Sequence, residues 1–228
     1  MQIRHAEGAN VKQFDGTDLF AALIHELKNN LGLLSMTIER IPMQNDPAHD
    51  ETVDAARLQC QGVVDRLQQS LLVYKAANQP IHPAIDAYSP HDLVHEIRDR
   101  AVALSRGRLR VEASLAPDVP AIWFFDRDLI EMALINAVHN SLTHARSSIR
   151  IEAGRVDGCL ALMVRDDSDG YPEHILASVA TCAPYRATGT GLGLQFARMI
   201  AQSHDNMGRL GELRLHNDQG AVFSLLLP

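Results

Sequence analysis

The sequence predicts an α+β chain, with an amino-terminal two-helix hairpin followed by an α/β sandwich domain. Apolar residues recur at alternating steps of three and four over residues 20–41 and again over 50–77, which is the period of amphipathic helices with a bundle-type seam. Beyond residue 89, alternating strand patterns are interleaved with helical ones. That order is typical of helices packed on one face of a largely antiparallel sheet.

The composition is that of a globular protein large enough to bury a core. A formal net charge of −7 argues against a nucleic-acid partner or an anionic membrane surface. Cys60, Cys159 and Cys182 lack metal-ligand spacing and cannot all pair, so we expect reduced thiols and a cytoplasmic location. No apolar run reaches transmembrane length and no signal peptide is recognisable, so no membrane insertion is expected.

The first helix places one histidine on its solvent face. At roughly 100° per residue, His25 lies about 160° from Leu27 of the apolar seam, and Asn29 lies about 40° from His25 on the exposed side. A turn-rich segment at 43–50 precedes the second helix. Two helices alone bury too little apolar surface, so we expect a homodimer in which two hairpins form a four-helix bundle. The seams are Phe20, Leu23, Ile24, Leu27, Leu31, Leu34, Ile38 and Ile41, and Val53, Ala56, Cys60, Val63, Leu67, Leu71 and Tyr74.

Composition divides the chain into a tail at 1–16, the hairpin at 17–78, a proline-rich linker at 79–88 and a second domain at 89–228. The linker could also be the entry to an edge strand. Asp157-Gly158 predicts a tight hairpin turn, and residues 167–189 show no clear period. The second domain is predicted to hold helices at 89–106, 126–145 and 191–204, and strands at 108–115, 121–125, 148–154, 159–166, 212–217 and 221–227.

Two segments of the second domain carry polar groups suited to a nucleotide. Asn136 and Asn140 lie one helical turn apart, and an amide oxygen can ligate Mg²⁺. Asp166 ends a predicted strand, where its carboxylate can accept a hydrogen bond from the exocyclic amine of a base. Gly170 lets the backbone approach a planar ring. Taken singly, each segment is explained better by a solvated helix face or an acidic turn.

A third segment, GTGLGL, opens the last predicted helix. The free N–H groups and positive dipole end of such a helix start suit phosphate oxygens. The segment fits neither a Walker loop nor the dinucleotide-binding fingerprint. Its candidate phosphate-binding residues are Gly189, Gly191, Leu192 and Gly193.

In this order, and with HELKNNLG in front, the three segments closely resemble two-component sensor histidine kinases, whose ATP-binding domain is shared with gyrase, Hsp90 and MutL. The resemblance covers residues 17–227. It implies an ATP-dependent autokinase that uses ATP and Mg²⁺ and passes the phosphoryl group to the aspartate of a response regulator receiver domain, with phosphatase activity as a second option.

The resemblance also implies residue roles. His25 is the phosphoacceptor, Glu26 the general base and Asn29 a support for phosphatase chemistry. Asn136 and Asn140 form the asparagine motif, with Asn140 the Mg²⁺ ligand. Asp166 and Gly170 bind adenine, and the phosphate motif is formed by Gly189, Gly191, Leu192 and Gly193.

Three positions and a short lid at 171–188 depart from the family pattern; Asn30 bears on a kink in the first helix, and the other departures predict weaker ATP binding. Asn30 stands in place of a proline, and Ser168 in place of a glycine. Thr143 stands where the family has a basic residue, so His144 or Arg146 would have to reach the phosphates.

Three alternatives stay open. The first is a histidine phosphotransfer or phosphatase-only protein with a weakened ATP site. The second is a Ser/Thr kinase or anti-sigma-type switch with the same ATP domain. The third is an Hsp90- or MutL-type ATPase, disfavoured because Glu131 lies five residues before Asn136. No sensor domain is recognisable, so a separate sensor protein is an expected partner.

Overall fold

A computed structural model describes residues 27, 29–38, 40–41, 49, 52–53, 55–57, 59–60, 62–64, 67, 81–180 and 192–228. His25, Glu26, Gly189 and Gly191 lie outside this set. Residues 29–38 are helical. Arg57 Nη2 donates to Ile38 O (3.2 Å) and Cys60 Sγ to Leu31 O (3.4 Å), an antiparallel order of contacts. The full hairpin stays a prediction, because most of residues 17–78 lies outside the described set.

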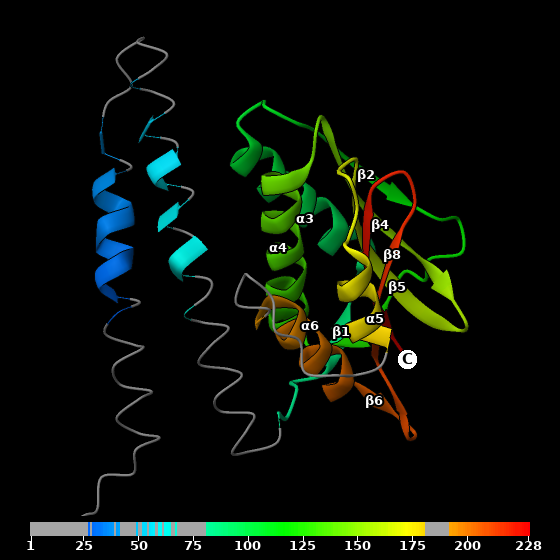
Figure 1. The fold of residues 1–228 in the computed structure, drawn as a ribbon. Helices are drawn as coiled ribbons and strands as arrows, with labels where there is room; N and C mark the ends of the chain where they lie inside the picture. Colours follow the sequence, from blue (N-terminus) through cyan, green and yellow to red (C-terminus); the bar gives the residue numbers. More distant parts are fainter. Residues whose placement is uncertain are drawn as a thin grey trace, which may run out of the picture.

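The second region contains four helices and nine strands within its described residues (Figure 1). The helices are α3 (Pro90–Ser105), α4 (Arg127–His144), α5 (Glu173–Ala180) and α6 (Leu192–Ser203). The strands are β1 (Asp86–Tyr88), β2 (Arg110–Leu115), β3 (Trp123–Phe125), β4 (Ser148–Val156), β5 (Cys159–Asp166), β6 (Asp205–Asn206), β7 (Arg209–Leu210), β8 (Glu212–Asn217) and β9 (Ala221–Leu227). None of the described helices is long and apolar enough to span a membrane.

A five-stranded mixed sheet in the order β2-β4-β5-β9-β8 organises this region. Only β2 and β4 pair in parallel; the other neighbours are antiparallel. Helices α3, α4 and α6 cover one face (Figure 1). The sheet contributes alternate residues to the core under them, and these residues pair across strands, as Leu162 does with Leu225 and Val164 with Phe223. The predicted α/β layer is therefore confirmed.

Local sequence signals explain where the helices begin and end. The side chain of Ser89 accepts a hydrogen bond from Asp92 N at the start of α3, and Pro90 fills the first turn, where no N–H partner is needed. Asp126 caps α4 by accepting from Leu129 N (3.0 Å). The β4–β5 turn has positive φ at both Asp157 (53°) and Gly158 (81°), as a two-residue hairpin requires.

Helix α5 and the β6–β7 hairpin were absent from the sequence prediction, and strand β1 was foreseen only as an alternative to the linker. Helix α5 lies inside the stretch that showed no period, and Arg198 of α6 donates to Ser178 O near its end (3.2 Å). Strand β1 pairs with β3, so part of the proposed linker packs on the second region. The β6–β7 hairpin has two-residue strands, too short to produce an alternating pattern.

A buried histidine joins three segments behind the sheet. His204, 3% exposed, accepts a hydrogen bond at Nε2 from Asp126 N (3.0 Å) and donates from Nδ1 to Ile200 O (2.7 Å), so its neutral tautomer is fixed. Asp126 in turn accepts from Ala84 N (2.7 Å). One imidazole and one carboxylate thus connect the end of α6, the start of α4 and the segment that enters β1.

Candidate functional site

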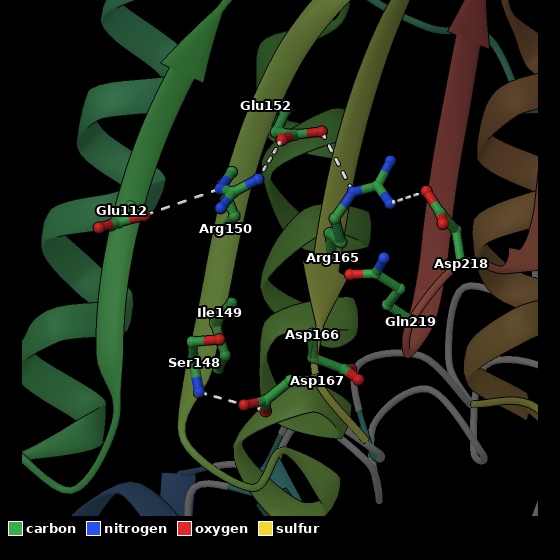
Figure 2. A pocket seen from close by; sticks show the side chains of 10 residues that line it. All are labelled: Glu112, Ser148, Ile149, Arg150, Glu152, Arg165, Asp166, Asp167, Asp218 and Gln219. Atoms are coloured by element: carbon green, nitrogen blue, oxygen red, sulfur yellow. Dashed lines mark hydrogen bonds and ion pairs between the residues drawn. The ribbon is translucent and has the colours of Figure 1, made fainter. Parts of the chain in front are cut away.

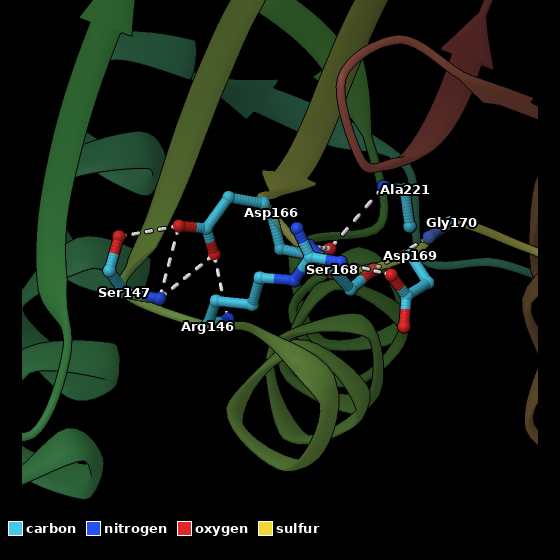
Figure 3. A network of polar contacts seen from close by, with 8 residues as sticks. Arg146, Ser147, Asp166, Ser168, Asp169, Gly170 and Ala221 are labelled. Carbon is cyan, nitrogen blue, oxygen red and sulfur yellow. Dashed lines mark hydrogen bonds and ion pairs between the residues drawn. The ribbon is translucent and has the colours of Figure 1, made fainter.

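Asp166 lies at the end of β5 with its carboxylate held from three directions. Ser141 Oγ of α4 donates to Oδ2 (2.7 Å), while Ser168 N and Ala221 N donate to Oδ1 (3.0 and 3.3 Å). Figure 3 shows the contact from Ala221 and the loop that follows β5. The side chain is 8% exposed. A buried carboxylate with a fixed orientation is suited to reading a hydrogen-bond donor on a ligand.

Asp167 fastens the same loop to the α4–β4 turn. Its carboxylate accepts from Arg146 N (2.8 Å), Ser147 N (3.0 Å), Ser147 Oγ (2.5 Å) and Ser148 N (3.2 Å). Burial on its own would raise the pKa of Asp167, but these hydrogen bonds outweigh it and hold that pKa far below the usual range. The loop is therefore clamped by a carboxylate that stays ionised at any physiological pH.

The serine that replaces a glycine of the family pattern fits this loop without strain. Ser168 N donates to Asp166, and its Oγ accepts from Gly170 N (3.1 Å), a local turn that a serine hydroxyl makes readily. Ser168 is not among the described residues with positive φ. The structure gives no reason for this substitution to weaken the pocket.

Arg146 is one of the two residues predicted to replace the missing phosphate-binding cation, and this prediction is untested. Its guanidinium pairs with Asp169 (Figure 3). Thr143 Oγ1 donates to His139 O (3.0 Å), and His144 lies exposed at the end of α4. Of the two predicted candidates, Arg146 forms an ion pair and His144 forms none among the described contacts.

Asn217 at the end of β8 holds the far side of the loop. Its Oδ1 accepts from Tyr171 N (2.7 Å) and its Nδ2 donates to Tyr171 O (2.9 Å). A Cβ on Gly170 (φ +85°) would lie 2.6 Å from the Asn217 side chain, so the glycine meets both a steric and a conformational need. Burial raises the pKa of the Tyr171 phenol far above its usual value, and the charge of Asp166 adds to this effect.

The asparagine motif and the start of α6 meet by close packing. Asn136 is buried (9% exposed), and a Cβ on Gly193 would lie 2.7 Å from its Nδ2. A larger residue at position 193 would therefore have to displace the Asn136 side chain. Asn140, one turn further on, is exposed. Leu192 begins α6, whereas Gly189 and Gly191 lie outside the described residues.

These features fit ATP and Mg²⁺. The Asp166 carboxylate supplies an acceptor for a base, and α6, a helix of 12 residues, begins beside Asn136 and directs its positive end toward that site. Asn140 offers an exposed amide oxygen, a ligand type that Mg²⁺ accepts. Within the described part of the chain, no group of three or more His, Cys, Asp or Glu side chains is placed to hold a metal.

A hollow of about 420 Å³ lies on the sheet face opposite the helices, and Asp166 and Asp167 form one end of its lining (Figure 2). A ladder of ion pairs crosses it, from Glu112 to Arg150 (3.7 Å), Arg150 to Glu152 (3.5 Å), Glu152 to Arg165 (3.5 Å) and Arg165 to Asp218 (2.7 Å). The acidic and basic groups neutralise one another across neighbouring strands. We assign this hollow no ligand.

Residues 125–228 match the family described as histidine kinase-, DNA gyrase B- and HSP90-like ATPase. AfsQ2, a signal transduction histidine-protein kinase of Streptomyces coelicolor, is 35% identical over 107 residues, 43% of this chain and 19% of AfsQ2. AtoS of Escherichia coli, also named a histidine-protein kinase, is 26% identical over 92% of this chain and 34% of AtoS. The sensory histidine kinase/phosphatase NtrB of Klebsiella oxytoca is 25% identical over 100% of this chain and 65% of NtrB.

Solved structures show the same fold. Full-length ShkA, crystallised with AMPPNP, has a TM-score of 0.67 at 17% identity over 93% of this chain and 46% of ShkA. The catalytic domain of the histidine kinase ThkA has a TM-score of 0.52 at 21% identity over 63% of this chain and 95% of that domain. The chain spans less than two thirds of each of the three curated relatives. Residues 125–228 therefore match the family model of histidine kinase-, DNA gyrase B- and HSP90-like ATPases, and the chain as a whole is similar to sensor histidine kinases.

Proposed function

We propose that this chain is an ATP-dependent protein histidine kinase that phosphorylates His25 and passes the phosphoryl group to the aspartate of a response regulator receiver domain. The observation that carries the proposal is the site around Asp166. There a buried acceptor for a base, the asparagine helix and the start of α6 come together in a domain of this ATPase family. Survival of these residues argues against a phosphotransfer protein that has lost its ATP site.

The proposed chemistry divides between the two regions. A ring nitrogen of His25 attacks the γ-phosphorus of ATP, the bond to the β–γ bridging oxygen breaks, and ADP leaves. Glu26 accepts the proton that the imidazole gives up. Mg²⁺, held by Asn140, would neutralise charge on the phosphate oxygens. A receiver aspartate then takes the phosphoryl group from the histidine nitrogen, and the imidazole regains the proton that Glu26 had accepted, which restores neutral His25.

The proposed homodimer is supported by exposed apolar side chains in the first helix. Leu27 (46% exposed) and Leu34 (49%) belong to the predicted seam, yet they face solvent in a single chain. A second copy would cover them in a four-helix bundle. A receiver domain and a separate sensor protein are proposed as further partners, with a cytoplasmic location and the domain limits 17–78 and 89–228.

An ATP titration with Mg²⁺, followed by an assay for acid-labile phosphate, tests the kinase. His25→Gln is expected to abolish the label, because it removes the nucleophile, and to leave ATP affinity unchanged. His49→Gln, in the segment just before the second predicted helix, is the control and should keep the label. Acid-labile phosphate remaining on the His25→Gln protein would overturn His25 as the acceptor.

A phosphatase activity is the second candidate, favoured by Asn29, which is exposed on a helix one turn after His25. An amide there can position the water that attacks a phosphorylated aspartate, without taking its proton. Asn29→Ala should slow dephosphorylation of the regulator about tenfold or more while autophosphorylation stays within about twofold. Asn30→Ala, an exposed neighbour on a different helix face, is the control. Equal loss of both activities in Asn29→Ala would contradict the assigned role.

A further inference from the structure

Ser141 gives the pocket a hydroxyl group whose role the proposed function does not require. It lies on α4, one residue after Asn140, and is 5% exposed. Its Oγ donates to Asp166 Oδ2 across 25 residues of sequence (2.7 Å). The following argument rests on the proposed ATP site, since it concerns how that site reads the base.

The contacts of Asp166 leave one acceptor position beside Ser141. Oδ1 already accepts from two backbone amides, those of Ser168 and Ala221. In the described structure, Oδ2 accepts only from Ser141, and a carboxylate oxygen can accept a second hydrogen bond. A donor that reaches Oδ2 therefore arrives next to Ser141 Oγ.

The two oxygens form a pair that matches one edge of adenine. They lie 2.7 Å apart, so two neighbouring atoms of one ring edge can each meet one of them. The carboxylate can only accept, whereas a hydroxyl rotates and donates its proton where an acceptor is offered. On the Watson–Crick edge of adenine, the 6-amino donor stands beside the N1 acceptor.

We propose that Ser141 is a specificity-determining residue that reads N1 of the adenine ring. In the empty site, the Ser141 hydroxyl donates its hydrogen bond to Asp166 Oδ2. With the base bound, the 6-amino group donates to Asp166 Oδ2 in its place, and the Ser141 hydroxyl turns to donate to N1. The number of hydrogen bonds at Oδ2 is conserved, and no buried polar group is left without a partner.

A purely structural serine would behave differently. If Ser141 only satisfied the buried carboxylate, its removal would weaken every nucleotide equally. A ligand that differs from ATP at one atom separates the two roles. That ligand is 1-deaza-ATP, in which a C–H group replaces N1 and the 6-amino group is kept.

The experiment is a calorimetric cycle with the full chain, Mg²⁺, ATP and 1-deaza-ATP. We expect Ser141→Ala to lower ATP affinity about three- to tenfold while 1-deaza-ATP affinity stays within about twofold, because only ATP loses a hydrogen bond. A further ligand, 7-deaza-ATP, keeps N1 and should follow ATP. Ser105→Ala removes another buried helix hydroxyl (1% exposed), which bonds its own helix, and should change neither affinity.

Ser141→Cys keeps the size of the side chain with a weaker donor, and should give an intermediate preference for ATP if the alanine variant does not fold. Equal weakening of ATP and 1-deaza-ATP in the Ser141 variants, or no weakening of either, would overturn the role of Ser141 and leave the ATP site standing. Failure of the unaltered chain to bind ATP would overturn the proposed function itself, and the inference with it.

Discussion

The two ends of the candidate site are built by different physical means. At the end proposed to bind the base, the loop after β5 is fixed by hydrogen bonds with α4, the α4–β4 turn, β8 and β9. At the phosphate end, the start of α6 is positioned by packing, because Gly193 lacks the Cβ that would strike Asn136. The base end is therefore specified by polar partners, and the phosphate end by the absence of a side chain.

This difference separates the effects of substitution. Changing a polar group at the base end should alter affinity through a hydrogen bond or a charge. Adding volume at the phosphate end should move Asn136 and leave the charges as they are. The predictions below are ordered from the largest expected effect to the smallest.

Gly220→Ala should produce the largest loss. A Cβ there would lie 1.9 Å from Asp166 O, and the backbone has φ +148°. A backbone clash added to a strained conformation should lower the free energy of unfolding by about 4 kcal/mol or more, measured by denaturant titration. Gly208→Ala, also at positive φ (+85°) but in open space, should cost only about 1–2 kcal/mol. Similar losses in both variants would show that β9 does not approach Asp166 this closely.

Asp166→Asn should weaken ATP binding about 10- to 100-fold, because an ionised acceptor becomes a neutral amide of the same shape. Isothermal titration calorimetry measures this effect. Asp99→Asn, whose side chain is 67% exposed, is the control and should leave ATP affinity unchanged. An unchanged affinity in Asp166→Asn would mean that the base does not bind at this carboxylate.

Gly193→Ala should lower ATP affinity about tenfold with little change in stability. Alanine has a helix propensity about 1 kcal/mol more favourable than glycine. This gain offsets the cost of moving the Asn136 amide, whose Nδ2 would otherwise lie 2.7 Å from the new Cβ. Gly62→Ala, helical with open space around it, should be stabilising and leave affinity unchanged. A large fall in the melting temperature of Gly193→Ala would indicate that Asn136 cannot move.

Acid should destabilise the domain through the far end of α6. Burial lowers the pKa of His204 below its ordinary value of 6.5, against opposing effects of its hydrogen bond to Ile200 and the charge of Asp126. Neutral His204 therefore contributes stability above about pH 6.5 that is lost as the pH falls toward the lower pKa of the folded state. Melting temperatures from pH 8 to pH 5 should show this loss, and His204→Gln should flatten it. An equal slope in both proteins would refute the assignment.

Local features of the sequence predicted most of the regular structure. Ser89 and Pro90 predicted the start of α3, Asp126 predicted the start of α4, and Asp157-Gly158 predicted the β4–β5 turn. Each of these signals acts within a few residues of where it stands. Helix α5 was not predicted, because eight residues are too few to establish a helical period.

The partners of the site could not be foreseen for the opposite reason. Asp166 was identified as a base-binding candidate, but Ser141 lies 25 residues before it and Ala221 lies 55 residues after it. Asn217 reaches Tyr171 across 46 residues. Such contacts depend on strand order and register, which no local period encodes. The pairing of Arg146 with Asp169 likewise follows from the placement of two turns.

The position of β9 between β5 and the edge strand β8 has a consequence for how the domain folds. This strand, 221–227, is buried throughout, and β8 pairs with the sheet only through it. During synthesis, β8 leaves the ribosome before it has a neighbour to pair with. Asn217 and Ala221 can form their hydrogen bonds with the residues at the end of β5 and in the loop after it only once β9 has paired with β5. The proposed base pocket is therefore completed last, and a chain that ends before residue 221 could not form it.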